Sequence, residues 1–473
     1  MKSLLKKIEY FSKSNPYKNA YIVGKNSISY LELWTQASKL ALSLSAQGTE
    51  PVIIYGHKET EVLVCILACI ISNRNYIPID ISLPLSRLIK IREASNASLI
   101  INVSNLEISN LENYALEDLI SENDLSTIKE NSNELVYTIF TSGTTGSPKG
   151  VPISKKNLNN FINWINSLKP LNQYKNIVVF NQANFSFDLS VADLYYSLSN
   201  GHTLVSLDSH ETDLVEILKV FKDERINVAF LTPTFIKLCL LSEYFNEKNL
   251  KNLKCIYFCG ECLEVKTVCK LYEAFPNLEI INAYGPTEAT SAISAINITK
   301  DMLMEKLLPV GDIHTLATEV EIKDNEIVLK GASVFGGYLG GYIGGFFREN
   351  NENCYRTGDL GYICDEKLYC KGRADNQIKY KGYRIELADI ENNILSISGV
   401  DECVVVPLYN DMGIVKSLKA FVVSSENLMM SEIKQELKKY LPYYMIPNIF
   451  EKIDSLPMTI NGKVDRKKLL EIG

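Results

Sequence analysis

The chain has 473 residues, of which 46% are hydrophobic and 22% charged, so it can bury a sizeable core and is not a disordered polymer. Its 56 acidic and 49 basic residues give a net charge of -7. With no block of basic residues, this charge argues against nucleic-acid binding through bulk electrostatics. The length predicts two or three domains.

Cysteine usage and the apolar segments predict a reduced, cytoplasmic protein that does not insert into membranes. The 11 cysteines lack a paired spacing, and no nearby group completes a zinc site at Cys255, Cys259 and Cys262 in a chain with 4 histidines. Met1–Phe11 lacks the apolar stretch and cleavage site of a signal peptide. Val62–Ile71, the most apolar window, has half of the ~20 residues that span a bilayer, so we expect a buried helix there.

Short apolar runs alternate with helical periods in the first third of the chain. The expected elements are a strand at Val52–Tyr55, a helix at Glu61–Ser72, a strand at Tyr76–Ile79, a helix at Arg87–Ser95 and a strand at Ser98–Val103. A second series of strands begins at Ile177–Val179 and continues with Thr203–Ser206, Val228–Leu231 and Cys255–Phe258. Such alternation is typical of βαβ units and a mostly parallel sheet.

The pattern changes after Pro309. A hairpin is expected from Glu319–Ile322 and Glu326–Leu329, and the glycine-dense stretch 331–345 cannot form a regular helix. Beyond a boundary near Asp375, the expected elements are a helix at Glu386–Ile397, strands at Cys403–Pro407 and Ala420–Val423, and a helix at Ser431–Leu441. The predicted fold is therefore α/β: a large domain, 1–374, with parallel sheets and a small β-barrel-like subdomain, and a small α+β domain, 375–473.

The segment Tyr137–Gly150 (YTIFTSGTTGSPKG) has the composition of a phosphate-binding loop. Its glycines permit close backbone approach, its hydroxyls donate to phosphate oxygens and Lys149 adds positive charge, before a helix that begins between Ser154 and Leu158. A Walker A loop does not fit, because Pro148 precedes the lysine and a glycine replaces the magnesium-binding hydroxyl. The alternative is a flexible Gly/Ser turn.

This loop resembles the phosphate-binding signature of the adenylate-forming superfamily, which contains acyl-CoA synthetases, luciferases and nonribosomal-peptide adenylation domains. The other motifs of the superfamily follow in its usual order, at Phe187–Ser190, Asn282–Glu288, Tyr355–Asp359, Gly372–Glu386 and Asn461–Arg466. The resemblance covers essentially the whole chain. It implies that ATP activates a carboxylate, with release of pyrophosphate, and that Mg²⁺ is required.

The resemblance also implies roles for individual residues. Thr141 and Ser142 would bind phosphate, with Thr144 and Lys149 as catalytic neighbours. The adenine and α-phosphate would be framed by Asn282, Ala283, Tyr284 (stacked on the base), Gly285, Pro286 and Thr287. Glu288 would bind Mg²⁺, Asp359 would accept both ribose hydroxyls beside Arg373, and Lys463 would bridge the substrate carboxylate and the α-phosphate. Taken alone, Asp359 and Lys463 also fit ordinary turn residues.

Asp188, in the apolar run FSFDLSV, is the residue that bears on the class of substrate. A carboxylate there is costly unless it is paired, and in amino-acid-activating relatives the matching aspartate binds the substrate ammonium. An N-cap is the structural alternative. Leu189 would lie beside it. Aryl- and fatty-acid-activating relatives generally lack this aspartate.

Within the superfamily, the chain most resembles the D-alanine–carrier protein ligase family of teichoic-acid D-alanylation. The resemblance is carried by Tyr55–His57, Asn184–Val191, Asp193–Tyr195, Leu231–Phe235, Phe258–Glu261 and Met458–Lys463. In that family, a cysteine at the position of Cys259 narrows the pocket around the methyl group of D-alanine. Gly260 follows it in this chain. Ser291 departs from the usual apolar residue and favours a more polar pocket. An enzyme of peptide natural-product type, loading an L-amino acid or serine, therefore stays open.

The acceptor is expected to be a separate phosphopantetheinylated carrier protein, because no carrier domain follows Lys463. Two half-reactions in one site imply a moving part, and Asp375 matches the hinge position of the family. We expect a monomer. A coenzyme A ligase and a non-catalytic nucleotide-binding scaffold are the remaining alternatives.

Overall fold

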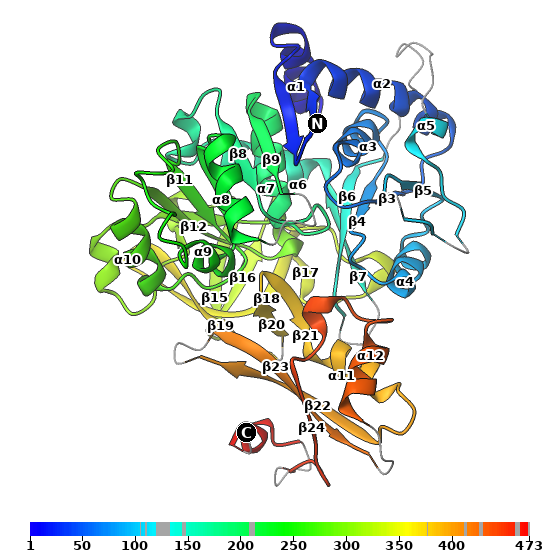
Figure 1. Ribbon diagram of the computed structural model, residues 1–473, viewed down its shortest axis with the longest axis vertical. Helices are drawn as coiled ribbons and strands as arrows, with labels where there is room; N and C mark the ends of the chain where they lie inside the picture. The colour runs from blue at the N-terminus through cyan, green and yellow to red at the C-terminus, as the bar shows by residue number, and fades with distance from the viewer. Residues whose placement is uncertain are drawn as a thin grey trace. The chain divides into compact units, whose positions relative to one another are not determined.

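The protein is described by a computed structural model that covers residues 1–104, 106–108, 111–119, 133–143, 148–207, 213–375, 377–410, 414–424, 429–458 and 464–471. The chain forms two compact units (Figure 1). Unit 1 consists of Met1–Ile81, Ser95–Ile139 and Gly150–Ala374. Unit 2 consists of Ser82–Ala94, Phe140–Lys149 and Asp375–Gly473.

The first sheet of unit 1 has five strands, in the order β5-β3-β4-β6-β7. These are β5 (Leu99–Asn102), β3 (Val52–Tyr55), β4 (Tyr76–Ile79), β6 (Leu135–Thr141) and β7 (Lys149–Ser154). β3 pairs in parallel with β4 and β5, as expected for βαβ units. The connecting helix α3 (Thr60–Ile71) is buried from Val62 to Ile70, which confirms that the most apolar window is a core helix.

The second sheet of unit 1 has eight strands, and most of the predicted site residues lie on its strands or in the segments that connect them. Its order is β13-β12-β11-β10-β8-β9-β1-β2. The strands are β13 (Ser294–Asn297), β12 (Glu279–Tyr284), β11 (Cys255–Phe258), β10 (Val228–Leu231), β8 (Val178–Asn181), β9 (Thr203–Ser206), β1 (Asn19–Val23) and β2 (Asn26–Ser29). Only the two edge pairings are antiparallel. The predicted strands at β9, β10 and β11 have the predicted bounds, because each is a short, fully buried apolar run.

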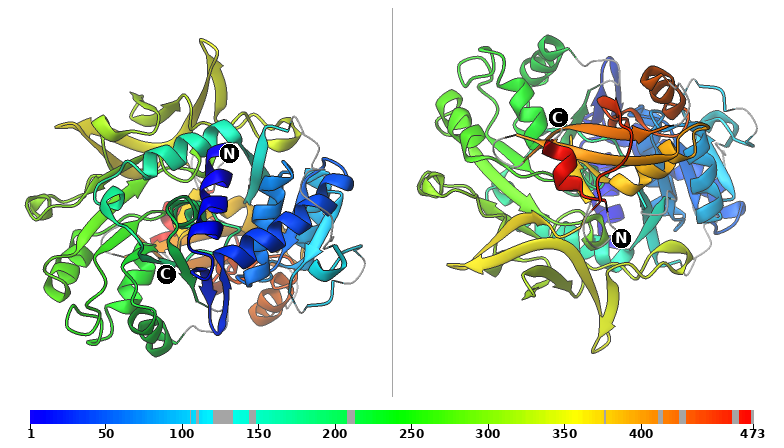
Figure 2. Two further views of the ribbon diagram at one scale, coloured as in Figure 1. Left: turned by 90° about the horizontal axis from the view of Figure 1, so that it is seen from above. Right: turned by 90° about the horizontal axis from the view of Figure 1, so that it is seen from below.

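Helices cover these sheets. They are α1 (Lys2–Ser14), α2 (Tyr30–Ala46), α5 (Leu116–Leu119), α6 (Lys155–Ile165), α7 (Leu189–Asn200), α8 (Leu214–Asp223), α9 (Pro233–Cys239) and α10 (Val265–Ala274). α1 packs against α2 (Figure 2) and also against α7. α7 is buried from Leu189 to Ser199, since it contacts β8, β9 and β10 as well as helices α1 and α6. Among the described residues, no helix has the length and apolarity to cross a membrane.

The third sheet of unit 1 corrects the expectation of a barrel-like subdomain. It is an antiparallel sheet in the order β14-β19-β18-β16-β15, with β17 paired to β18, and its described strands do not close into a barrel. The strands are β14 (Gly311–Asp312), β19 (Lys367–Arg373), β18 (Glu352–Cys364), β16 (Glu326–Lys330), β15 (Glu319–Lys323) and β17 (Phe346–Glu349). The 13-residue β18 pairs with β16, β17 and β19, so it is the central strand of an open sheet. The predicted hairpin of β15 and β16 turns at Asp324 and Asn325, both with positive φ.

A second correction concerns the segment after the phosphate loop. The expectation was a strand followed by a loop and then directly by a helix. Instead β7 lies between the loop and α6, whose N-cap Ser154 accepts a hydrogen bond from the Asn157 backbone. Val151 and Ile153 are fully buried, which stabilises a strand despite Gly150 and Pro152.

Unit 2 is an α+β arrangement built from three stretches of chain. Its strands are β20 (Gln377–Tyr380), β21 (Tyr383–Glu386), β22 (Glu402–Tyr409), β23 (Val415–Val423) and β24 (Ile449–Lys452), and its helices are α11 (Leu387–Leu395), α12 (Met430–Leu437) and α13 (Arg466–Glu471). Nearly all of α4 (Leu85–Ser95) also belongs to unit 2. Arg87 of α4 donates to the Asp389 carboxylate at 2.6 Å, with side-chain exposures of 8% and 0%.

Candidate functional site

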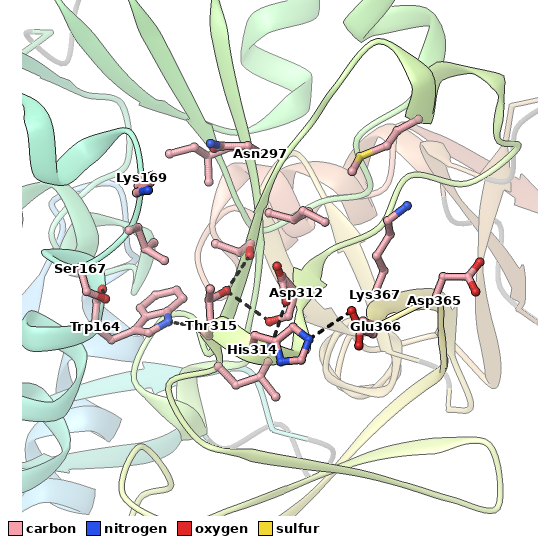
Figure 3. A pocket seen from close by; sticks show the side chains of 16 residues that line it. Trp164, Ser167, Lys169, Asn297, Asp312, His314, Thr315, Asp365, Glu366 and Lys367 are labelled. Atoms are coloured by element: carbon pink, nitrogen blue, oxygen red, sulfur yellow. Dashed lines mark hydrogen bonds and ion pairs between the residues drawn. The ribbon is translucent and has the colours of Figure 1, made fainter.

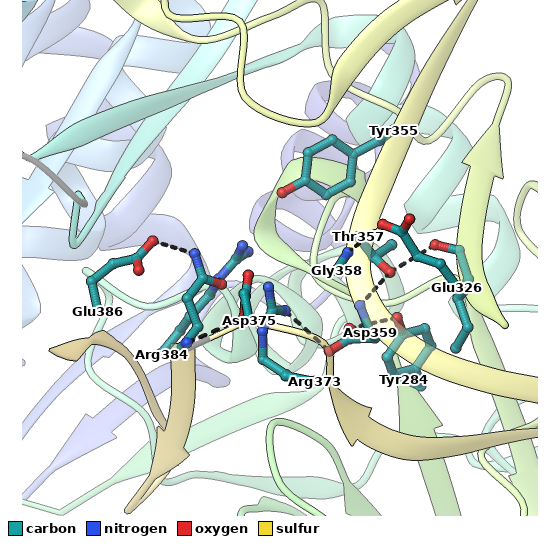
Figure 4. Close-up of polar contacts among 12 residues, drawn as sticks. Tyr284, Glu326, Tyr355, Thr357, Gly358, Asp359, Arg373, Asp375, Arg384 and Glu386 are labelled. Carbon is teal, nitrogen blue, oxygen red and sulfur yellow. Dashed lines mark hydrogen bonds and ion pairs between the residues drawn. The ribbon is translucent and has the colours of Figure 1, made fainter. Parts of the chain in front are cut away.

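The Asp359 carboxylate is the centre of a buried polar cluster in unit 1 (Figure 4). Asp359 on β18 stands opposite Arg373 on β19, and the Arg373 guanidinium donates to Oδ1 at 3.0 Å. The Tyr284 hydroxyl, from the end of β12, donates to Oδ2 at 2.7 Å. The structure therefore brings together three residues that lie far apart in the sequence and were all predicted to contact the nucleotide.

Burial favours the hydrogen bonds within this cluster. The pKa of the Tyr284 hydroxyl is raised, first by burial and then by the Asp359 charge, so the phenol stays protonated and donates. The Asp359 backbone N–H donates to Thr357 Oγ1 at 3.0 Å. Thr357 was missed as a site residue, although it belongs to the Tyr355–Asp359 motif that located Asp359.

The predicted nucleotide-binding segment 282–287 follows β12 into a tight turn. Asn282 Nδ2 donates to the Pro309 carbonyl at 2.8 Å, so this side chain holds the backbone of its own unit, and Ala283 beside it is buried. A Cβ on Gly285 would lie 2.5 Å from Ala292 Cα, a contact that only glycine avoids. Pro286 is the N-cap of the short 3-10 helix Thr287–Ala289.

Glu288, the predicted magnesium ligand, lies in that helix and is 1% exposed. Its Oε1 accepts a hydrogen bond from the Tyr338 hydroxyl at 2.6 Å, and its backbone carbonyl accepts one from Phe335 N at 2.8 Å. No group of three His, Cys, Asp or Glu that could hold a metal exists in the described part of the chain. One oriented carboxylate fits Mg²⁺, which takes one or two carboxylates and completes its shell with waters and substrate phosphates.

Asp188 lies beside this segment. Thr287 Oγ1 donates to Asp188 Oδ2 at 2.6 Å. Asp188 immediately precedes α7, as the N-cap alternative required, but its carboxylate makes no capping bond with that helix. The half-buried carboxylate is thus oriented toward the 282–288 segment, and Leu189 behind it is buried.

The remaining predicted substrate residues are Cys259, Gly260 and Ser291. Cys259 is 4% exposed at the end of β11, and Gly260 turns the chain with φ +91. The pKa of the Tyr257 hydroxyl is raised, first by burial and then by the charges of Cys259 and Asp188. The hydroxyls of Tyr257 and Ser291 have no hydrogen-bond partner among the described residues. Tyr257 does not stand out in the sequence, because an aromatic inside a buried strand is normally a core residue.

The predicted phosphate-loop residues that are described fall in unit 2. Ser142 Oγ donates to the Arg384 carbonyl at 3.1 Å and accepts from the Glu386 backbone at 3.0 Å. Lys149 Nζ lies 3.7 Å from the Glu386 carboxylate, whose pKa is raised mainly by burial. Thr141 ends β6, half-buried. Two of the predicted catalytic residues, Thr144 and Lys463, lie outside the described residues, so the structure does not place them.

Asp375, the predicted hinge, is exposed, and its carboxylate accepts a hydrogen bond from the Gln377 backbone at 3.1 Å. None of the predicted site residues lines the cavity of about 780 Å³ elsewhere in unit 1 (Figure 3). That cavity is bordered by Trp164 and Asn297 and by the exposed pair of His314 and Glu366, 3.2 Å apart.

Comparisons with known proteins agree with the geometry. Residues 8–339 match the model of the family described as AMP-binding enzyme, and residues 389–463 match that of the AMP-binding enzyme C-terminal domain. The chain is 38% identical to the D-alanine–D-alanyl carrier protein ligase of Bacillus licheniformis, over 99% of both chains. It is also 38% identical to the ligase of that name from Listeria monocytogenes, over 99% of this chain and 98% of that protein.

Two solved structures show the same fold at lower identity. The Vibrio cholerae adenylation domain AlmE, in complex with glycyl-adenosine-5'-phosphate, matches with a TM-score of 0.85 at 24% identity, over 100% of this chain and 97% of that chain. PA1221, a protein containing adenylation and PCP domains, matches with a TM-score of 0.84 at 22% identity, over 99% of this chain and 84% of that chain.

Proposed function

The chain belongs to the AMP-binding enzyme family and is an ATP-dependent ligase, and from that premise we propose that it activates D-alanine as the aminoacyl-adenylate and loads it onto a separate carrier protein. The name shared by its 38%-identical relatives supports this substrate and this acceptor. The polar clusters described above support the assignment of individual residues to ATP and to the amino acid.

The observation that carries the proposal is the hydrogen bond between Thr287 and Asp188, 2.6 Å long. This contact orients the Asp188 carboxylate toward the segment that precedes Glu288, which supports its assignment to a substrate ammonium. A charged carboxylate so oriented, and half-buried, is stabilised when a cationic group binds it. An amino acid supplies that cation, whereas a fatty or aryl acid does not.

In the first half-reaction, a carboxylate oxygen of D-alanine attacks the α-phosphorus of ATP, and the bond to the β-phosphoryl group breaks to release pyrophosphate. We assign Asp188 to the ammonium, Asp359 and Arg373 to the ribose, and Thr141, Ser142 and Lys149 to the phosphates. Thr144 and Lys463 would complete the charge stabilisation at the α-phosphate. Glu288 would hold Mg²⁺, which when bound with the nucleotide neutralises phosphate charge.

In the second half-reaction, the phosphopantetheine thiol of the carrier protein attacks the acyl carbonyl, loses its proton, and displaces AMP to leave a thioester. We propose a carrier protein rather than free coenzyme A as acceptor. Aminoacyl-CoA formed as efficiently as aminoacyl-carrier would contradict this acceptor.

Amino-acid-dependent pyrophosphate exchange tests the substrate. We expect strong exchange with D-alanine and weak exchange with L-alanine, glycine, D- and L-serine and benzoate. Changing Asp188→Asn should lower kcat/KM for D-alanine by about a hundredfold, because a neutral amide no longer pairs with the ammonium. Full exchange by this variant would remove Asp188 from the substrate site.

One observation favours a second candidate, an enzyme that activates serine. The Ser291 hydroxyl is 2% exposed and has no hydrogen-bond partner in the described part of the chain, and an unpaired buried hydroxyl costs about 1–3 kcal/mol. A substrate hydroxyl would satisfy it. Exchange that is stronger with serine than with D-alanine, and that Ser291→Ala reverses, would establish this candidate.

A further inference from the structure

A buried lysine connects the two parallel sheets of unit 1. Lys58 follows β3 of the five-stranded sheet and is 3% exposed. Its Nζ donates to the backbone carbonyl of Gln182 at 2.9 Å and to that of Asn181 at 3.4 Å. Both carbonyls lie at the end of β8, in the eight-stranded sheet. Lys58 itself is held by the Tyr21 hydroxyl, which donates to its carbonyl at 2.8 Å.

A buried carboxylate on α7 completes the connection. Asp193 is 0% exposed, and its Oδ2 accepts a hydrogen bond from Asn181 Nδ2 at 2.8 Å. The other carboxyl oxygen has no hydrogen-bond partner among the described residues, and burial raises the pKa of Asp193 well above its usual value, against the opposing effects of the Asn181 hydrogen bond and the Lys58 charge. Ser206 Oγ donates to Asn181 Oδ1 at 2.7 Å, which fixes the amide between strand and helix.

These contacts bracket the loop that carries Asp188. The loop leaves β8 at Gln182 and enters α7 after Asp188. Lys58 holds the start of the loop by its carbonyls. Asn181 and Asp193 tie the same strand end to the helix that the loop enters. A lysine on the other sheet therefore holds the start of the loop that leads to Asp188.

We propose that Lys58 is a positioning residue for amino-acid activation, which acts with Asp193 to hold the loop Gln182–Asp188 so that Asp188 meets the substrate ammonium. The inference rests on the proposed role of Asp188. Removing a charge from water costs free energy, and an apolar side chain of similar volume would fill this place without that cost, so fold stability alone does not account for a buried lysine here. A geometric demand on the loop does.

The charges that face Lys58 come from two other elements. Asp193 approaches from α7, and Asp80, 2% exposed at the end of β4, adds a second carboxylate. His57 lies next to Lys58 in the chain, and its Nδ1 is 2.5 Å from Asp80 Oδ2. Burial lowers the pKa of Lys58 to about 8, against the opposing effect of both carboxylates, so the lysine is mostly protonated at neutral pH.

The test compares Lys58→Met and Asp193→Asn with wild type in pyrophosphate exchange. We expect each variant to raise the KM for D-alanine about tenfold while the KM for ATP stays within about twofold. Asp193→Asn keeps the side-chain shape and serves if Lys58→Met does not fold. The matched control is Lys419→Met in unit 2, which removes a lysine of 6% exposure, 2.7 Å from Glu451, and should leave both KM values unchanged.

Folded variants with an unchanged KM for D-alanine would overturn the inference. So would a parallel rise of both KM values, because that marks general loosening rather than a misplaced Asp188. If wild type exchanges with a different amino acid, the proposed substrate fails, yet the ratio of variant to wild type with that amino acid still tests Lys58. Failure of the two proposals is thus distinguishable.

Discussion

Two neighbouring donors orient the Asp359 carboxylate, which we propose binds the ribose diol of ATP. Arg373 and Tyr284 each donate to one of its oxygens, at 3.0 and 2.7 Å. Each carboxylate oxygen has a second lone pair, which leaves acceptor capacity for two ribose hydroxyls. These two hydrogen bonds fix the orientation of the carboxylate, so little ordering would be needed when a ribose binds it.

Changing Asp359→Asn should therefore affect ATP more than the amino acid. The amide would place N–H groups against one of the two donors, which leaves a buried polar group unpaired at a cost of about 1–3 kcal/mol. We expect the KM for ATP to rise at least about tenfold with little change in the KM for D-alanine, measured by pyrophosphate exchange. Tyr284→Phe, which removes one donor only, should give a smaller rise.

His202 predicts a pH dependence of stability. It is 1% exposed, neither ring nitrogen has a hydrogen-bond partner among the described residues, and its ring packs on Tyr196. Burial lowers the pKa of His202 to about 3 from 6.5, with help from Lys18 and Lys175. The unfolded chain therefore binds the His202 proton more readily than the folded protein does. The contribution of neutral His202 to the unfolding free energy is complete above pH 6.5 and is lost as the pH falls toward 3.

Between pH 7 and pH 5, the unfolding free energy of wild type should fall. That of His202→Phe should fall by on the order of 2 kcal/mol less. Denaturant unfolding at both values measures the difference. Phenylalanine keeps the ring volume, so packing is largely preserved. Equal losses in both proteins would mean that His202 is not the group responsible.

At this scale, sequence reasoning could select some residues and not others, for definable reasons. Asp188, Asp359 and Arg373 were selected as candidate site residues because their motifs stand in a fixed order, and the structure brings the last two together. Tyr338, which binds Glu288, lies in a glycine-rich stretch with no periodicity to mark it. Pairing of such distant residues depends on tertiary contacts that local sequence does not encode.

At the scale of elements, strands with four buried positions were predicted with accurate bounds. β3, β4 and β9 are examples. β7 was missed because its glycine and proline are typical of turns, yet the core buries the residues between and beyond them. β8 begins one residue later than expected and ends two later, since its last residue is the polar but fully buried Asn181.

The turn after β12 yields a prediction at this scale. Gly285→Ala would press a Cβ against Ala292 Cα at 2.5 Å and Ile293 N at 2.9 Å, both backbone atoms that cannot swing away. We expect a loss of about 1–3 kcal/mol in unfolding free energy and weaker ATP binding. The control is Gly336→Ala, whose Cβ would meet nothing within 4 Å and should change stability by less than ~0.5 kcal/mol. Similar losses in both variants would contradict this explanation.

At the scale of the whole molecule, we propose that the two half-reactions use different conformations of the chain, with the hinge at Asp375. Changing Asp375→Pro fixes φ near -65° and should restrict that change. We expect pyrophosphate exchange to be retained and carrier-thioester formation to fall by at least about a hundredfold. Asp375→Ala, which leaves the backbone free, should support both. Equal loss of exchange and transfer in the proline variant would count against a hinge at this residue.

The sequence alone could not reveal which stretches of the chain make up unit 2. A boundary near residue 375 can be suggested from a change in texture, but Ser82–Ala94 and Phe140–Lys149 join the same unit from far upstream. Their membership depends on contacts such as Ser142 with Glu386. Only long-range packing, not periodicity, determines it.

The ion pair of Arg87 and Asp389 bears on how this protein can be cut and recombined. Asp389 is 0% exposed, so a fragment that starts at 375 would carry a carboxylate stripped of its 2.6 Å partner, a defect that costs about 3–5 kcal/mol if it stays buried. Chimeras that exchange the C-terminal portion with a relative face the same difficulty. A sound crossover must transplant the α4 residue together with its acidic counterpart, which makes the inheritance of this portion non-modular.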